Sequence, residues 1–174
     1  PRFPSDNVAE AGSKIAQLLD ELDAGPDDLA LTQGACGGDL LFSEACQRRG
    51  VHLQWLQPFQ EPDFMLRSVI RCGEAWRQRY LDVRQKLTNK ILAAPKELGE
   101  PPSYAADGYA YERCNMWLLY TALAWGVDRV HFVCLWNAGG GDGPGGTAHM
   151  YQEVAKRTGQ VHWVDTRTLG RSDD

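Results

Sequence analysis

The sequence predicts a three-layer α/β domain, in which a mainly parallel sheet of about five or more strands is flanked by helices. Three observations carry this prediction. Short apolar segments alternate with segments of helical periodicity, the segment 129–136 is almost continuously apolar, and two glycine-rich segments each lie between a strand and a helix. A length of 174 residues suits a single domain over residues 1–174.

Five segments are expected to form the strands. "VHLQWLQ" alternates apolar and polar residues and stops at Pro58. "RVHFVCLW" has the composition of a strand that is buried on both faces. The five ranges are 28–33, 51–57, 90–95, 129–136 and 161–164, which together predict a Rossmann-like parallel sheet.

The intervening segments show helical spacing. The first helix carries Ile15, Leu18, Leu19 and Leu22 and ends before Gly25-Pro26. Two helices are expected between the second and third strands, one over 62–72 and one carrying Trp76, Tyr80, Val83 and Leu87. A Pro/Gly-rich loop over 96–108 precedes the helix with the clearest stripe of apolar residues, and a last helix follows the second glycine-rich segment. That stripe comprises Cys114, Trp117, Leu118, Thr121, Ala122 and Trp125.

Composition and charge exclude several classes of protein. The net charge is -5, so the chain lacks the excess of basic residues that is typical of nucleic-acid binders. Thirteen of the 18 basic residues are arginine, which suits a local anion pocket. No apolar run is long enough to span a membrane, and no signal peptide opens the chain. We expect a cytoplasmic domain, excised from a larger protein because the chain opens on "PRFPSD" without a methionine.

The five cysteines predict neither a metal site nor a disulfide framework. Their number is odd, and none has C-x-x-C spacing. Disulfides are rare in the cytoplasm. We therefore expect reduced, buried or half-buried thiols, with no metal and no cofactor.

The two glycine-rich loops, "GACGGD" (34–39) and "NAGGGDGPGGT" (137–147), are expected at one edge of the sheet. Loops that lead from a parallel strand into a helix all lie at the carboxyl edge. Glycine allows backbone N–H groups to approach a ligand closely, and a helix N-terminus favours an anion. Each loop alone could be an ordinary turn, with Asp39 and Thr147 as helix N-caps. Two such loops at one edge favour a nucleotide-like site.

The same loops resemble those of known families. "LTQGACGGDLLFSEACQRRG" resembles the "SGGARGID…A…GG" segment of the DNA-processing protein A (Smf) family, and "GPGGTAHMYQEV" resembles the "PGGxGTxxE" loop of the Lonely Guy phosphoribohydrolases. Both families belong to the SLOG superfamily. Together with "PFQEPDF" and "YERCNMW", the pattern resembles SLOG domains of bacterial conflict and signalling proteins, whose relatives include the Thoeris effector and the cytosolic domain of melastatin-type TRP channels.

This resemblance implies a ligand sensor of bacterial signalling or antiphage defence. Its ligand would be a nucleotide-derived molecule, such as an ADP-ribose-like or cyclic nucleotide signal, and it would regulate an effector domain. It also implies a homo-oligomer, no nucleic-acid partner, and a further strand ahead of the first helix, upstream of Pro1.

The departures from the family pattern favour binding over catalysis. Met150 occupies the position of the catalytic glutamate of GTxxE, and a methionine cannot transfer a proton. Cys36 replaces the phosphate-contacting arginine of GARGID. One alternative is a phosphoribohydrolase acting on nucleoside monophosphates, with Arg113 holding phosphate and Glu153 as the acid. A second is a structural interaction domain.

The expected ligand-binding residues come from the two loops and four further positions. Arg113 could grip phosphate or be solvated or ion-paired, and Asn115 could read a ribose or base edge. Phe59 could stack on a base or pack in the core, and His149 could donate to phosphate or be exposed. The loop positions are Gly34, Ala35, Cys36, Gly37, Gly38 and Asp39 in the first loop, and Gly141, Gly143, Gly145, Gly146 and Thr147 in the second.

Overall fold

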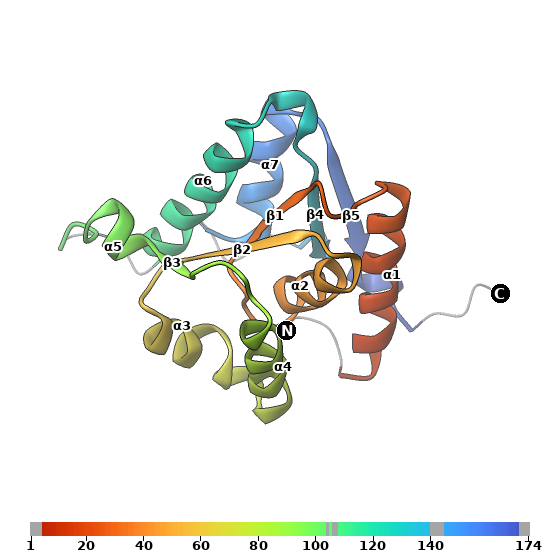
Figure 1. Ribbon diagram of the computed structural model, residues 1–174, viewed down its shortest axis with the longest axis horizontal. Helices are drawn as coiled ribbons and strands as arrows, with labels where there is room; N and C mark the ends of the chain where they lie inside the picture. The colour runs from red at the N-terminus through yellow and green to blue at the C-terminus, as the bar shows by residue number, and fades with distance from the viewer. Residues whose placement is uncertain (1–4, 104, 106–107, 140–144, 171–174) are drawn as a thin grey trace.

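The computed structural model describes residues 5–103, 105, 108–139 and 145–170. Its strands are all paired in parallel (Figure 1). One sheet has the order β1-β2-β3, and β4 pairs with β5 in a second sheet. The strands are β1 (Leu29–Thr32), β2 (His52–Gln57), β3 (Leu92–Ala93), β4 (Phe132–Trp136) and β5 (Val161–Asp165).

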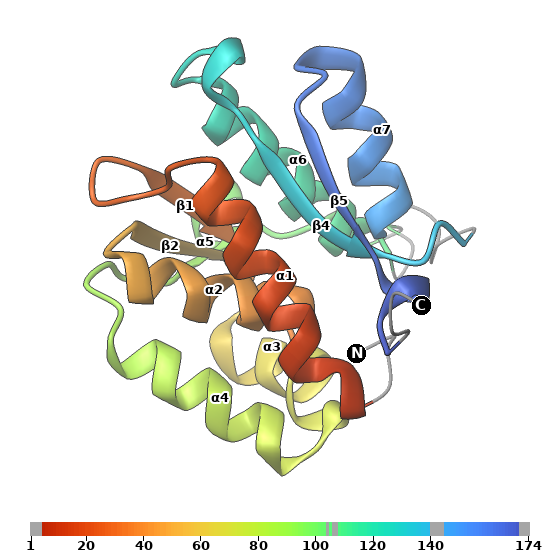
Figure 2. The same cartoon turned by 90° about the vertical axis from the view of Figure 1, so that its right-hand side faces the viewer.

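Helices cover the strands from two sides, which confirms the mixed α/β class. α1 packs against α2, and α2 against α4, on one side (Figure 2). On the other side α6 contacts β1 and β2, and α7 contacts β4 and β5. The α-helices are α1 (Val8–Glu21), α2 (Gly38–Arg49), α3 (Glu61–Ser68), α4 (Glu74–Gln85), α5 (Ala94–Leu98), α6 (Tyr109–Leu123) and α7 (Thr147–Arg157), and the 3-10 turns are η1 (Ser5–Asn7), η2 (Ile70–Cys72), η3 (Val127–Arg129) and η4 (Thr166–Thr168).

The part of the chain that the structure describes contains no helix that is both long and apolar enough to cross a membrane.

The predicted single sheet is observed as two. All five expected segments contain a strand, but among the described residues β1 pairs only with β2, and β4 only with β5. β3 is shorter than expected because α5 begins at Ala94 and carries a proline in its first turn. Proline has no N–H for a strand ladder, and its fixed φ suits the start of a helix.

The largest part of the core lies between the first sheet and α1, α2, α3 and α4. Trp55 of β2 is fully buried, and its ring lies 4.8 Å from that of Tyr80. The indole N–H of Trp55 donates to Ser43 Oγ at 3.1 Å, so the one polar atom of the ring is satisfied. Trp125, expected on the buried stripe of α6, is instead 63% exposed because that helix ends at Leu123.

The expectation that all cysteines are reduced is wrong for one pair. Cys36, in the first glycine loop, forms a disulfide with Cys72 in η2, with 6.5 Å between their Cα atoms. The two lie 36 residues apart, so the pairing arises from tertiary packing and has no local sequence signal. The remaining three cysteines are buried and free. Burial raises the pKa of Cys46 and of Cys134 to about 12, which makes these thiols unreactive at neutral pH.

The His131–His162 pair predicts a pH dependence of stability. Nδ1 of His131 lies 3.0 Å from Nε2 of His162, and burial together with this neighbour lowers the pKa of His162 below 6.5. Neutral His162 therefore contributes stability that is fully present above about pH 6.5 and is lost as the pH falls. We expect the urea midpoint to fall between about pH 7.5 and about pH 5.5, and to fall less in His162→Gln. Equal losses in both proteins would contradict this account.

Candidate functional site

A cavity of about 1390 Å³ lies between β1 and β4. Backbone and side chains of both strands line its length, from Asp28 and Arg129 at one end to Asp39 and Asn137 at the other. The second end is the carboxyl edge of both sheets, where the loops after β1 and β4 open into α2 and α7. The two predicted glycine loops therefore do converge on one cavity.

The first loop is shaped by glycines and held by Asp39. Gly34 has φ +84, and a Cβ at this position would lie 2.8 Å from the ring of Trp55. Gly37 has φ +101 and is the N-cap of α2, so Asp39 is not the cap that the sequence suggested. Asp39 instead lies in the first turn, where its carboxylate accepts a hydrogen bond from the Ala35 N–H at 3.2 Å. The loop is thus folded back over its own helix.

The half-buried carboxyl group of Asp39 is subject to two opposing effects on its pKa. Burial raises its pKa, while hydrogen bonds from the Ala35 backbone and the Thr32 side chain oppose that rise. These hydrogen bonds occupy its oxygens within the loop. Asp39 therefore serves to position the loop.

The second loop is pressed against the start of α6. Gly145 has φ +87, and a Cβ there would lie 2.7 Å from the backbone nitrogen of Glu112 and 2.9 Å from Cβ of Tyr111. Gly146 is the N-cap of α7, and Thr147 is the first helical residue. Gly141 and Gly143 lie outside the described residues.

Asn115 of α6 connects the two loops. Its Oδ1 accepts a hydrogen bond from Gln33 Nε2 at 2.7 Å, and its Nδ2 donates to the Gly145 carbonyl at 2.8 Å. Gln33 directly precedes the first glycine loop and is buried. Asn115 was expected to read a ribose or base edge. In the structure it hydrogen-bonds the residue before the first loop and a glycine of the second loop, so both loops are fixed relative to α6. Gln33 was not among the expected site residues.

Both helices begin at the cavity without a side-chain cap. Neither Gly37 of α2 nor Gly146 of α7 can supply one, and among the residues that the structure describes no side chain makes a capping hydrogen bond at either N-terminus. The first N–H groups of a helix have no partner within it, and together they carry partial positive charge. Two such termini facing one cavity form an anion-binding arrangement.

Two arginines missed by the sequence analysis also line the cavity. Arg67 of α3 and Arg71 of η2 are exposed, and neither has a carboxylate within ion-pair distance among the described residues. The Arg67 guanidinium lies 4.8 Å from the centre of the Phe59 ring. Both arginines lie in the segment 62–72, which the sequence predicts to be a helix that follows a strand. Residues four positions apart lie on the same face of a helix, so this spacing could have placed both arginines together at the carboxyl edge of the sheet.

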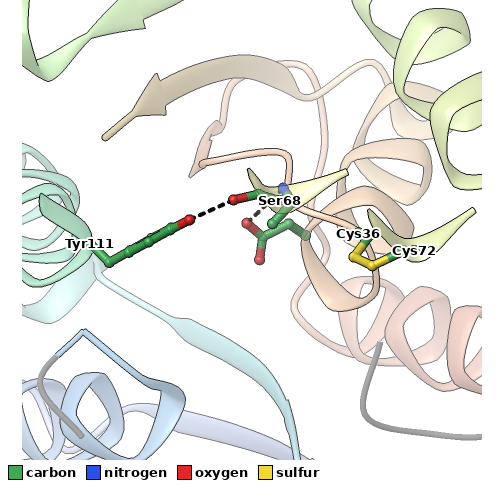
Figure 3. Close-up of a disulfide and its surroundings, with 6 residues drawn as sticks. Cys36, Ser68, Cys72 and Tyr111 are labelled. Carbon is green, nitrogen blue, oxygen red and sulfur yellow. Dashed lines mark hydrogen bonds between the residues drawn. A yellow bond between two sulfur atoms is a disulfide. The ribbon is translucent and has the colours of Figure 1, made fainter. Parts of the chain in front are cut away.

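The wall between these arginines and α6 is polar. Ser68 Oγ and Tyr111 Oη lie 2.9 Å apart and point toward one another, beside the Cys36–Cys72 disulfide (Figure 3). The Ser68 carbonyl accepts a hydrogen bond from the Cys36 N–H at 2.9 Å. The first loop is therefore fixed to α3 by a hydrogen bond and to η2 by the disulfide.

Most of the expected site residues that the structure describes line the cavity. Phe59 does not, and it packs edge-on against Tyr111, in line with its core-packing alternative. His149 lies 3.8 Å from Glu112 Oε1, away from the cavity lining. Gly34 is not part of the lining and lies against the ring of Trp55. The lining positions are Ala35, Cys36, Gly37, Gly38, Asp39, Asn115, Gly145, Gly146 and Thr147.

The structure does not bring the residues of the hydrolase alternative to the cavity. Arg113 donates to the carbonyls of Leu98 and Gly99, so it holds the end of α5. Glu153 pairs with Lys156 and Arg157, whose hydrogen bonds lower its pKa to about 2. A carboxyl group with that pKa is ionised at neutral pH and has no proton to donate. Met150 lines the cavity and is buried.

Comparison with protein-family models found no match for this chain, and no curated protein matches it significantly.

Proposed function

We propose that this chain is a Rossmann-like domain of the SLOG type, which binds the phosphate groups of a nucleotide-derived ligand at the carboxyl ends of β1 and β4. The observation that carries the proposal is the Asn115 bridge, which brings two uncapped helix N-termini to one cavity. Glycine motifs alone would be equally consistent with ordinary turns.

The chemistry of this edge favours an anion with more than one phosphate. Backbone N–H groups at the starts of α2 and α7 can donate to phosphate oxygens, and each helix terminus contributes about half a positive charge. Arg67 and Arg71 supply full charges on the third side, and an arginine can bind phosphate with two parallel hydrogen bonds. A diphosphate linkage, as in an ADP-ribose-like molecule, offers one phosphate group for each loop.

We infer that the domain senses its ligand without hydrolysing it. Incubation with AMP is expected to release no adenine above background, because Met150 and the ion-paired Glu153 leave the family's catalytic position without a proton donor. Chromatography of the reaction mixture measures this directly. Release of adenine that Glu153→Gln abolishes would favour the phosphoribohydrolase instead.

The biological setting rests on the sequence resemblance. We propose that ligand binding regulates an effector domain of a bacterial signalling or defence protein that acts as a homo-oligomer. We also propose a cytoplasmic location. In that location the Cys36–Cys72 disulfide would be an exception, because cytoplasmic reductants keep most thiols reduced.

Calorimetric titration tests the binding proposal. The panel is AMP, ADP, ADP-ribose and cyclic nucleotides, with adenosine as the phosphate-free control. We expect at least one phosphate-bearing compound to bind with a dissociation constant below about 1 mM and adenosine to bind more weakly. A panel in which no compound binds that tightly would refute the proposal.

A further inference from the structure

We propose that the Cys36–Cys72 disulfide is a redox switch of the anion site, so that the oxidised protein binds a phosphate-bearing ligand about tenfold more tightly than the reduced protein. The switch acts through Arg71, the residue next to Cys72. This inference rests on the proposed function, because it concerns the regulation of the same site.

The disulfide joins two parts of the anion site that come from different elements. Cys36 lies in the first glycine loop, two residues before α2 begins at Gly38, and Cys72 is the last residue of η2 (Figure 3). Cys36, Arg71 and Cys72 all line the cavity. The covalent bond therefore connects the loop at the start of α2, where backbone N–H groups can bind phosphate, to the turn that carries a guanidinium group.

The residues of η2 themselves hold this turn only weakly. None of its three residues is buried. The Cys72 N–H donates to the Val69 carbonyl at 3.0 Å, and the Gly73 N–H donates to the Ile70 carbonyl at 2.9 Å, so these hydrogen bonds are local. Segments with few buried contacts and local hydrogen bonds open at low cost in free energy. We therefore expect η2, with Arg71, to move away from the first loop once the disulfide is reduced.

Arg67 is held by contacts that do not involve the disulfide. It belongs to α3, which buries Phe64 and Ser68, and its guanidinium lies 4.8 Å from the centre of the Phe59 ring. The Cys36 N–H donates to the Ser68 carbonyl at 2.9 Å, and this backbone hydrogen bond needs no sulfur. Reduction should therefore release Arg71 and leave Arg67 beside the first loop.

The bond is open to a small dithiol reductant. The side chains of Cys36 and Cys72 are half-buried, and both residues line the cavity. One thiolate of the reductant attacks a sulfur of the pair, which breaks the S–S bond, forms a mixed disulfide and releases the other cysteine as a thiolate that takes up a proton. The second thiol of the reductant then displaces the remaining cysteine and leaves as a disulfide, so two electrons and two protons pass to the protein.

The other cysteines do not compete in this reaction. Cys46, Cys114 and Cys134 are free and buried, and with the disulfide pair they make up the five cysteines of the chain. A change in ligand affinity on reduction would therefore come from the Cys36–Cys72 pair. A reversible bond also suits the proposed cytoplasmic location, where disulfides are usually transient and serve catalysis or redox sensing.

Calorimetric titration of the oxidised and the dithiothreitol-reduced protein tests the switch. The ligand is whichever of AMP, ADP and ADP-ribose binds the oxidised protein most tightly. We expect reduction to weaken binding about tenfold, which is the loss of one arginine contact to phosphate. The double variant Cys36→Ser, Cys72→Ser should bind like the reduced parent and should not respond to dithiothreitol. Circular dichroism checks that the reduced protein stays folded.

The two arginines separate the switch from a general loosening of the site. Arg71→Gln should weaken binding about tenfold in the oxidised protein and less than about twofold in the reduced protein, where Arg71 has already left the site. Arg67→Gln is the matched control, and it should weaken binding about tenfold in both states.

Ligand binding should in turn stabilise the disulfide, because coupling between two equilibria is reciprocal. A tenfold difference in affinity corresponds to about 30 mV for a two-electron couple. We therefore expect the saturating ligand to make the midpoint potential of the Cys36–Cys72 pair about 30 mV more negative in a dithiothreitol redox titration.

Four results would overturn the switch. Equal affinity in the two redox states would do so and would leave the proposed function standing. The same loss from Arg71→Gln in both states would show that the disulfide does not act through Arg71. Unfolding of the reduced protein would identify the disulfide as a structural cross-link. Absence of binding by every compound in both states would refute the proposed function, and the switch with it.

Discussion

The single substitution Gly34→Ala at the site is expected to cause a large loss in the free energy of unfolding. Gly34 has φ +84, a conformation that costs about 1–2 kcal/mol for a residue with a Cβ. The new Cβ would lie 2.8 Å from the ring of Trp55, which is fully buried and hydrogen-bonded to Ser43. Overpacking of a rigid core adds about 1–3 kcal/mol. We expect urea unfolding to show a total loss of about 2–5 kcal/mol.

Gly159→Ala is the matched control for this prediction. Gly159 has φ +68, and a Cβ there would meet nothing within 4 Å. It therefore carries the backbone cost without the collision, and we expect a loss of about 1–2 kcal/mol. If the two variants lose the same free energy of unfolding, the close contact between Gly34 and Trp55 is not present in solution.

Replacement of Arg67 and Arg71 by glutamine is expected to cause a large loss of ligand affinity. Both line the cavity and have no carboxylate partner among the described residues, so a bound phosphate is their natural counter-charge. A hydrogen bond to a charged group contributes about 1.5–3 kcal/mol, so each substitution should weaken binding about tenfold and the pair about 100-fold. Calorimetry with the tightest phosphate-bearing compound of the panel measures this change.

The control for that experiment removes the same charge elsewhere. Arg48 of α2 and Arg77 of α4 are arginines outside the lining of this cavity, and Arg77 pairs with the exposed Glu74 on its own helix. The double variant Arg48→Gln, Arg77→Gln should bind the ligand nearly as the parent does. Equal losses in both double variants would mean that net charge, and not the site, controls affinity.

Local sequence patterns predicted the elements well, because each is determined by neighbours in the chain. Helical spacing placed Ile15 and Leu19 on the buried face of α1, and the glycines placed the loops at strand ends. The predicted buried stripe of α6 is wrong at Trp125, because helical spacing does not show that the helix ends at Leu123, before this residue.

Long-range contacts could not be predicted in the same way. The Gln33–Asn115 hydrogen bond joins residues 82 positions apart, and the Cys36–Cys72 disulfide depends on how η2 packs against the first loop. Arg113 carries the right chemistry for phosphate, but its chain position does not reveal that the end of α5 lies close enough to take its hydrogen bonds. The division of the sheet into two depends on a channel between β1 and β4 that no local pattern encodes.

NMR titration with ADP-ribose tests the central claim most directly, because it follows the backbone N–H groups at both helix N-termini separately. We expect the amides of Gly38 and Asp39 in α2 and of Thr147 and Ala148 in α7 to shift together and to saturate at one dissociation constant. Adenosine, which has no phosphate, should leave all four in place. Shifts confined to one loop, shifts elsewhere only, or equal shifts with adenosine would contradict a phosphate site built from the two glycine loops.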